Sequence, residues 1–170
     1  MNTIHKHINI LKFFFVIICF FIINEVNAAN IKSSAVVFMY HRFGEESYPS
    51  TNIKLDQFEK HLEEFANNNY NVVSLDYIID SFIAETNLPD KTIAITIDDG
   101  YKSILTEAWP RLKAYGFPLT VFVSTDPIDA NVRGYLSWDE IRKLKEEGVV
   151  IGSHTKTHPH LQNLSIDEIK

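Results

Sequence analysis

The sequence IAITIDDGY at residues 93–101 decides the predicted fold, because it joins a strand pattern to two adjacent carboxylates. Its apolar start at residues 93–97 is typical of a strand buried on both faces of a parallel sheet. Asp98, Asp99 and Gly100 follow directly. An Asp-Gly pair is also common in surface turns, but a buried strand before it favours a sheet end, where α/β proteins bind ligands.

A second stretch, VVIGSHTKTH at residues 149–158, likewise joins an apolar strand pattern to polar side chains, which here are imidazoles rather than carboxylates. Residues 149–151 predict another buried strand, and His154 and His158 follow it. Their i, i+4 spacing would align both rings if the segment formed one helical turn. The alternative is a pair of solvated loop histidines, and His-x-x-x-His alone is a weak signal.

The two stretches together predict a metal site. The carboxyl ends of parallel strands open at one rim, so the two loops are expected to meet. One Asp and both His would bind a divalent ion, and the other Asp would serve as a base. Such a site suits Zn²⁺ best, and also Co²⁺, Fe²⁺ or Ni²⁺. His41 ends the strand predicted at residues 35–40, and it either lines the same rim or is an ordinary loop histidine.

The rest of the chain predicts an α/β domain. Its 170 residues suit one domain, and 45% hydrophobic residues can bury a core. Strand and helix patterns alternate, which indicates a parallel sheet or barrel with helices outside. We expect strand 35–40 to be covered on both faces, and Phe58, Phe65 and Phe82 to lie in the core. The expected strands are residues 35–40, 71–73, 92–97, 119–123 and 149–151, and the expected helices are residues 55–67, 75–85, 102–115 (divided at Pro110) and 138–148.

The N-terminus has the pattern of an export signal. Residues 13–23 are continuously apolar after a weakly positive start, and small residues up to Ala28 suit a signal peptidase. A retained anchor is the alternative, but eleven residues are too few to cross ~30 Å of hydrocarbon. Residues 1–28 are therefore predicted to be a cleaved signal peptide, with no stable membrane span afterwards. We expect an exported protein, periplasmic or extracellular.

Charge and cysteine content narrow the function further. The net charge is -6 and no basic patch is present, which argues against nucleic acid as the main partner. The only cysteine, Cys19, lies inside the predicted signal peptide. The mature protein would then have no disulfide, and its stability would depend on the hydrophobic core.

Both stretches resemble the polysaccharide deacetylase family, also called NodB-homology or carbohydrate esterase family 4 proteins. TIDDGY at residues 96–101 and SHTKTH at residues 153–158 look like the first two family motifs. Residues 39–42 (MYHR), 135–141 (YLSWDEI) and 151–154 (IGSH) resemble an exported branch that opens with a Tyr-His strand. The resemblance runs from about Val36 to the last residue, and the specific feature is the two motifs in this order.

The resemblance implies a fold, a reaction and residue roles. The family fold is a distorted (β/α)₇ barrel, here expected over residues 35–170. Asp98 matches the family's catalytic base, and Asp99, His154 and His158 match its metal ligands. The implied reaction is metal-dependent hydrolysis of N-acetyl groups on a glycan that contains N-acetylglucosamine. The substrate polymer is left open between poly-N-acetylglucosamine, chitooligosaccharide and peptidoglycan, and protein partners and oligomeric state are unknown.

One departure from the family pattern keeps other functions open. Later family motifs supply an arginine that orients the base and a histidine that acts as general acid, and neither has a match up to Lys170. His160 is a poor substitute, because it follows Pro159 in the same loop. We therefore expect the C-terminal part of the domain to be missing. The alternatives are a truncated, non-catalytic glycan-binding or vestigial domain, and a metal-dependent amidohydrolase acting on a non-sugar amide or imide.

Overall fold

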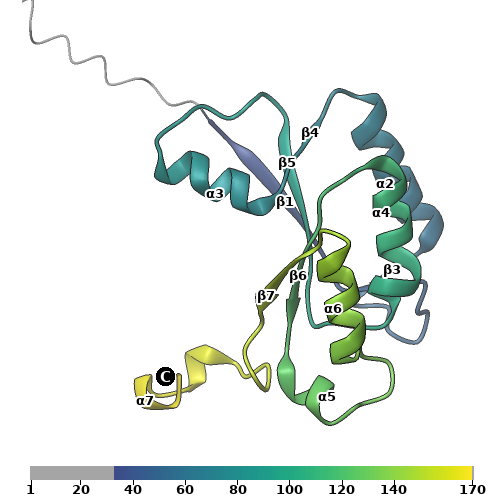
Figure 1. Cartoon of the computed structure of the whole chain (residues 1–170), viewed down its shortest axis with the longest axis vertical. Coiled ribbons are helices and arrows are strands. Elements are labelled where there is room, and N and C mark those ends of the chain that lie inside the picture. The colour runs from purple at the N-terminus through teal and green to yellow at the C-terminus, as the bar shows by residue number, and fades with distance from the viewer. Residues whose placement is uncertain (1–32, 170) are drawn as a thin grey trace, which may run out of the picture. The chain divides into compact units, whose positions relative to one another are not determined.

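A computed structural model describes residues 33–169, so the predicted signal peptide at residues 1–28 lies outside the described residues. The main sheet has five parallel strands, with the order β1-β5-β6-β7 and β4 paired beside the first residues of β5 (Figure 1). A separate two-stranded sheet pairs β2 with β3. The strands are β1 (Ala35–Tyr40), β2 (Arg42–Phe43), β3 (Asn52–Ile53), β4 (Asn71–Val72), β5 (Thr92–Ile97), β6 (Thr120–Val123) and β7 (Val150–Ser153).

The helices cover the two faces of the sheet unequally. Side chains alternate along β5, so Ile93, Ile95 and Ile97 pack in the large core cluster, while Ala94 packs with Ile78 in a smaller one. Figure 1 shows α2, α4 and α6 grouped on one side of the sheet and α3 on the other. The helices are α2 (Leu55–Asn67), α3 (Leu75–Ile83), η1 (Ile104–Ala108, a π-helix), α4 (Trp109–Tyr115), α5 (Thr125–Asp129), α6 (Trp138–Glu146), η2 (Leu161–Asn163, a 3₁₀-helix) and α7 (Ile166–Ile169).

Local sequence signals explain where the helices begin and end. Ser74 caps α3 by accepting a hydrogen bond from the Tyr77 backbone N–H, and Ser137 forms a complete capping box with Glu140 at the start of α6. The expected division of the helix near Pro110 is present. The π-helix η1 ends at Ala108, and α4 begins at Trp109, one residue before the proline. Gly116 ends α4 in the left-handed conformation, with φ 69°.

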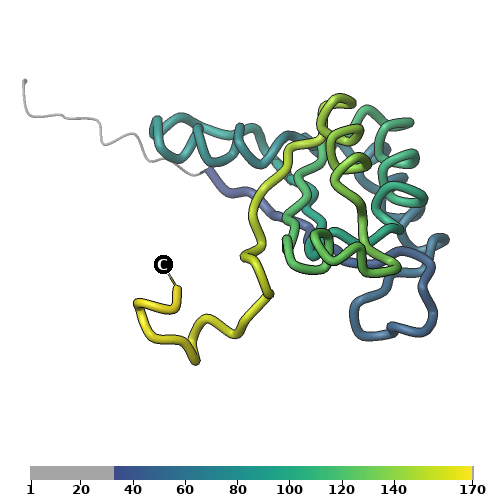
Figure 2. The backbone as a smooth tube through the Cα atoms, turned by 60° about the horizontal axis from the view of Figure 1, so that its bottom comes forward, coloured from purple at the N-terminus to yellow at the C-terminus, as the bar shows by residue number. Residues whose placement is uncertain are grey.

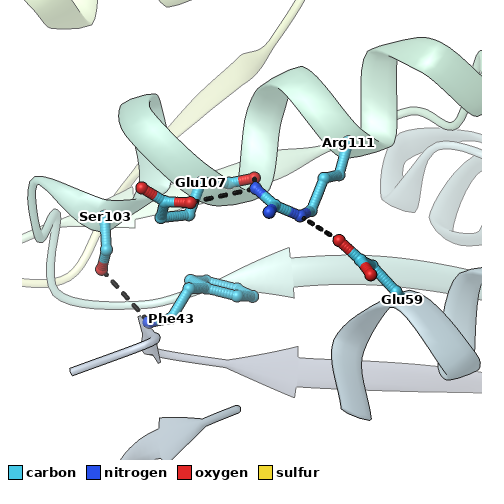
Figure 3. A network of polar contacts seen from close by, with 5 residues as sticks. All are labelled: Phe43, Glu59, Ser103, Glu107 and Arg111. Carbon is cyan, nitrogen blue, oxygen red and sulfur yellow. Dashed lines mark hydrogen bonds and ion pairs between the residues drawn. The ribbon is translucent and has the colours of Figure 1, made fainter. Parts of the chain in front are cut away.

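Ion pairs link neighbouring helices at the surface. Arg111 on α4 donates to Glu107 one turn earlier and to Glu59 on α2, with N···O distances of 3.0 Å for each pair (Figure 3). Partly exposed pairs of this kind stabilise a fold by only about 0.2–1 kcal/mol each. Helix packing against the sheet therefore depends mainly on the buried apolar core.

Two predictions about burial are wrong. β1 was expected to be covered on both faces, yet Val37 and Met39 are 45% and 59% exposed. Phe38 and Tyr40, which face the other way, pack in the large core cluster. Within the described residues β5 is the only sheet partner of β1, and the Val37 face has little cover. Phe82 is 50% exposed rather than buried, because α3 packs through Ile78 and Ser81 and Phe82 lies at the edge of that face.

The predicted α/β class with a parallel sheet is confirmed. The described strands form an open sheet and do not close into a barrel. Figure 2 shows the segment after β7 running away from the sheet and helices, and none of the residues of η2 or described residues of α7 is buried. No helix within residues 33–169 has both the length and the apolar character needed to cross a membrane.

Candidate metal centre and base

The two carboxylates lie where a fully buried strand ends. Every residue of β5 is buried, and Asp98 and Asp99 remain only 8% and 9% exposed. The backbone N–H of Asp98 still donates to the Tyr40 carbonyl at 2.9 Å, so this residue continues the β1 pairing. Asp99 then adopts a left-handed backbone with φ 75°, and Gly100 follows at φ 82°. The chain therefore turns sharply while both carboxylates stay at the strand end.

The histidine loop follows the neighbouring end of β7. The His154 N–H donates to the Val123 carbonyl at 2.9 Å, and the Ser124 hydroxyl donates to the His154 carbonyl at 3.0 Å. These bonds fix the loop to the end of β6. The segment does not form the helical turn that would align the two rings, because Thr155 and His158 both have left-handed backbones, with φ 68° and 53°.

An irregular turn nevertheless brings the two imidazoles together. The N–H of His158 donates to the Thr155 hydroxyl oxygen at 3.0 Å, which closes the turn. The ring centroids of His154 and His158 are 4.7 Å apart. The two imidazole rings therefore lie close together without a helical turn.

Asp99, His154 and His158 converge in the structure. Oδ1 of Asp99 lies 3.4 Å from Nε2 of His154 and 3.5 Å from Nε2 of His158. One potential ligand atom from each residue lies within 4.8 Å of the other two. Oδ1 of Asp99 is buried and has no hydrogen-bond partner among the described residues. A buried carboxylate oxygen facing two imidazoles fits a divalent cation, because a cation would compensate the desolvated charge.

Asp98 stays outside this three-residue cluster and has different electrostatics. Burial raises its pKa, and the neighbouring carboxylate of Asp99 adds to the increase. His154, His41 and His158 lower the pKa, but the net shift is upward. A carboxylate with a raised pKa beside a cation site is a stronger proton acceptor than an ordinary Asp.

His41 follows β1 and lies near Asp98. Its charge is one of those that lower the Asp98 pKa, which places its ring within electrostatic reach of that carboxylate. Its place at the rim of the site and its function stay predictions. His160 is exposed and does not belong to the Asp99, His154 and His158 cluster.

A cavity of about 210 Å³ adjoins the cluster. Besides Asp99 and His158, its lining includes Tyr101 and Tyr135, whose ring centroids are 4.8 Å apart. Neither tyrosine was among the predicted site residues. Tyr101 ends the motif at residues 96–101 and Tyr135 begins the family-like segment at residues 135–141, but neither segment indicated that the two residues would meet. The remaining lining residues are Ser124, Pro127 and Thr157.

Comparison with known proteins identifies the family. The family model described as polysaccharide deacetylase matches residues 85–170, which contain Asp98, Asp99, His154 and His158. The chain belongs to the polysaccharide deacetylase family.

The chain matches only part of the length of its curated relatives. It is 27% identical to YxkH of Bacillus subtilis (strain 168) over 129 residues, which is 76% of this chain and 45% of YxkH. It is 30% identical over 111 residues to the poly-beta-1,6-N-acetyl-D-glucosamine N-deacetylase of Escherichia coli (strain K12), covering 55% of this chain and 16% of that enzyme. The chain thus spans less than half the length of these curated relatives.

A solved structure supports the fold. The Streptococcus pyogenes deacetylase PplD, determined in complex with acetate, aligns with a TM-score of 0.70 and 22% identity. The alignment covers 79% of this chain and 62% of PplD. The open sheet described above therefore corresponds to part of a deacetylase fold.

Proposed function

We propose that this chain carries the base and metal-binding half of a metal-dependent carbohydrate N-deacetylase. The observation that carries the proposal is the convergence of Asp99, His154 and His158, with Asp98 beside them. Membership of the polysaccharide deacetylase family supports it. The proposed domain comprises residues 35–170, with residues 1–28 as a signal peptide that directs export to the periplasm or the cell exterior.

The proposed roles follow from the charges at the site. Asp99, His154 and His158 would hold a divalent ion, with Zn²⁺ the best match to one carboxylate and two imidazoles. When bound, such an ion polarises an acetyl carbonyl and acidifies water. Asp98 accepts the proton of the attacking water, since its buried carboxylate lies next to the cluster and outside it. The water oxygen bonds to the acetyl carbon, the C–N bond breaks, and the proton taken up by Asp98 passes to the leaving nitrogen, so that acetate and a free amine result.

The proposed substrate is an acetylated glycan containing N-acetylglucosamine. The name of the Escherichia coli relative, a poly-beta-1,6-N-acetyl-D-glucosamine N-deacetylase, supports this class. The cavity beside Asp99 is lined by two tyrosines, and aromatic side chains commonly pack against the apolar faces of ligands. His41 would lie at the rim of this site, near Asp98.

Acetate release tests the proposal directly. The full-length gene product should release acetate from N-acetylglucosamine oligomers, and a chelator should stop the release until Zn²⁺ is restored. A matched control is Asp139→Asn, which removes an exposed carboxylate on α6 whose side chain is 88% accessible. Activity that survives both chelation and Asp98→Asn would refute the proposal. Tight binding of the oligomers without acetate release would instead support a glycan-binding role.

A further inference from the structure

A buried arginine lies between two tyrosine rings beside the candidate metal centre. Arg42 is only 9% exposed, and its guanidinium carbon lies 3.8 Å from the ring centroid of Tyr48 and 3.4 Å from that of Tyr101. A planar guanidinium between two aromatic faces gains cation–π attraction on both sides, and partial desolvation strengthens it. Arg42 therefore fixes the plane of the Tyr101 ring.

An ion pair holds Arg42 in this position. Nη1 of Arg42 donates to Oε2 of Glu45 at 2.6 Å, and Oε1 of the same carboxylate accepts from the Ser103 hydroxyl at 2.6 Å. The Ser103 oxygen in turn accepts from the Phe43 backbone N–H at 3.2 Å (Figure 3). Arg42 and Phe43 form β2, whereas Tyr101 and Ser103 follow the Asp98-Asp99 turn. The network thus ties β2 to the segment that leaves the candidate metal centre.

Tyr101 connects this network to Asp99. Both residues line the same cavity, and the Tyr101 ring also packs against Tyr135. Tyr101 follows Asp99 by only two residues, across the left-handed turn formed by Asp99 and Gly100. A protonated tyrosine is a hydrogen-bond donor to a carboxylate. Oδ1 of Asp99 faces the histidines, so such a bond would fix the orientation of the carboxylate.

We propose that Arg42 is a positioning residue for the candidate metal centre: it stacks on Tyr101 and thereby holds the Asp99 carboxylate with Oδ1 toward His154 and His158. Residues that orient metal ligands typically contribute about 10–100-fold to metal affinity. This inference rests on the proposed function, because it requires those three residues to bind a metal ion. It adds Arg42 and Tyr101 to the residues that determine the affinity of the centre.

The test uses two substitutions that keep side-chain size. Arg42→Met removes the charge and the planar face, and Tyr101→Phe keeps the stacked ring but removes the hydroxyl. Zn²⁺ affinity of the full-length gene product is measured by calorimetry, and Co²⁺ binding by visible absorption. Each variant should bind Zn²⁺ roughly 10-fold more weakly and show an altered Co²⁺ spectrum. The double variant should resemble the single ones, because both act through one carboxylate.

A matched control separates positioning from folding. Lys102→Met removes a neighbouring cation that pairs with Glu140 on α6, so its Zn²⁺ affinity and Co²⁺ spectrum should equal those of the wild type. Urea unfolding shows that each variant is folded at the assay temperature. If Arg42→Met does not fold, the Zn²⁺ affinity and Co²⁺ spectrum of Tyr101→Phe decide the test, because this variant keeps the ring that stacks on Arg42.

The outcomes distinguish the two proposals. Wild-type protein that binds no Zn²⁺ would refute the proposed function, and the positioning role with it. Wild-type binding with unchanged affinity and spectrum in folded Tyr101→Phe would overturn only the positioning role. A purely structural Arg42 would lower the urea midpoint and leave both metal readouts unchanged.

Discussion

Oδ1 of Asp99 lies 3.4 Å from Nε2 of His154, although β6 separates the two strands that carry these residues. Neighbouring strands are about 4.8 Å apart, so β5 and β7, which lie on either side of β6, are about twice that distance apart. Two residues within these strands would therefore be farther apart than Asp99 and His154 are. The contact forms because both loops bend over the end of β6. Left-handed backbones at Asp99 and Thr155 provide the bends, and the Ser124 hydroxyl anchors the histidine loop.

Asp99→Asn should abolish tight metal binding. The substitution keeps the shape of the side chain but removes the negative charge that faces both imidazoles. Loss of a direct ligand should exceed the effect of losing an orienting residue, so we expect Zn²⁺ affinity to fall by more than about 100-fold. Calorimetric titration with Zn²⁺ measures this. Asp126→Asn is the control, because Asp126 pairs only loosely with Lys156, at 3.7 Å; equal losses in both variants would contradict the assignment.

Asp98→Asn should separate catalysis from metal binding. Loss of a general base lowers the rate by about 10²- to 10⁴-fold. Metal affinity should change only a few-fold, because Asp98 lies outside the ligand cluster. Acetate release and Zn²⁺ titration on the same preparation check both parts. A variant that loses metal and activity together would show instead that Asp98 is a ligand.

The metal-free protein should be more stable at neutral pH with Asn at position 98. A raised pKa in the folded state means that folding costs more free energy once the Asp98 carboxylate is ionised. This penalty is absent below the unfolded pKa of about 3.9 and develops as pH rises through the folded value. Urea unfolding at neutral pH and near pH 4 should show an advantage for Asp98→Asn that shrinks on acidification. If the stability advantage of Asp98→Asn grew on acidification, the pKa of Asp98 would not be raised in the folded protein.

Gly152→Ala should destabilise the junction of β6 and β7. Gly152 lies opposite Phe122 in the strand register, and an added Cβ would come within 2.5 Å of the Phe122 ring. Displacing that ring should cost about 1–3 kcal/mol in the free energy of unfolding. Chemical denaturation measures the loss. Combining Gly152→Ala with Phe122→Ala should recover part of it, and strictly additive losses would show that the ring is not the obstacle.

Strand and helix positions could be predicted from the sequence because their signals are local. The apolar run before Asp98, the amphipathic pattern of residues 55–67 and the Ser137 capping box each involve neighbouring residues. Burial of β1 could not be predicted in this way. An apolar run indicates what a strand can bury, whereas its actual cover depends on which elements pack against it.

The candidate site was only partly predictable for a similar reason. Carboxylates and imidazoles after buried strands indicated which residues could meet, and the topology brings them together. The backbone geometry of the histidine loop depends on hydrogen bonds from Ser124 and to Val123, which lie far away in sequence. The stacking of Arg42 on Tyr101 likewise joins segments with no shared pattern.

The exposed face of β1 has a consequence for handling the protein. β5 is its only sheet partner in the described residues, and Val37 and Met39, on one face of the strand, are 45% and 59% exposed. An unpaired strand edge with apolar side chains is a template for strand addition by another molecule. A preparation limited to residues 33–169 would therefore lose soluble monomer as concentration rises. Dilute refolding, or fusion to a solubilising carrier, is the appropriate route to purified material.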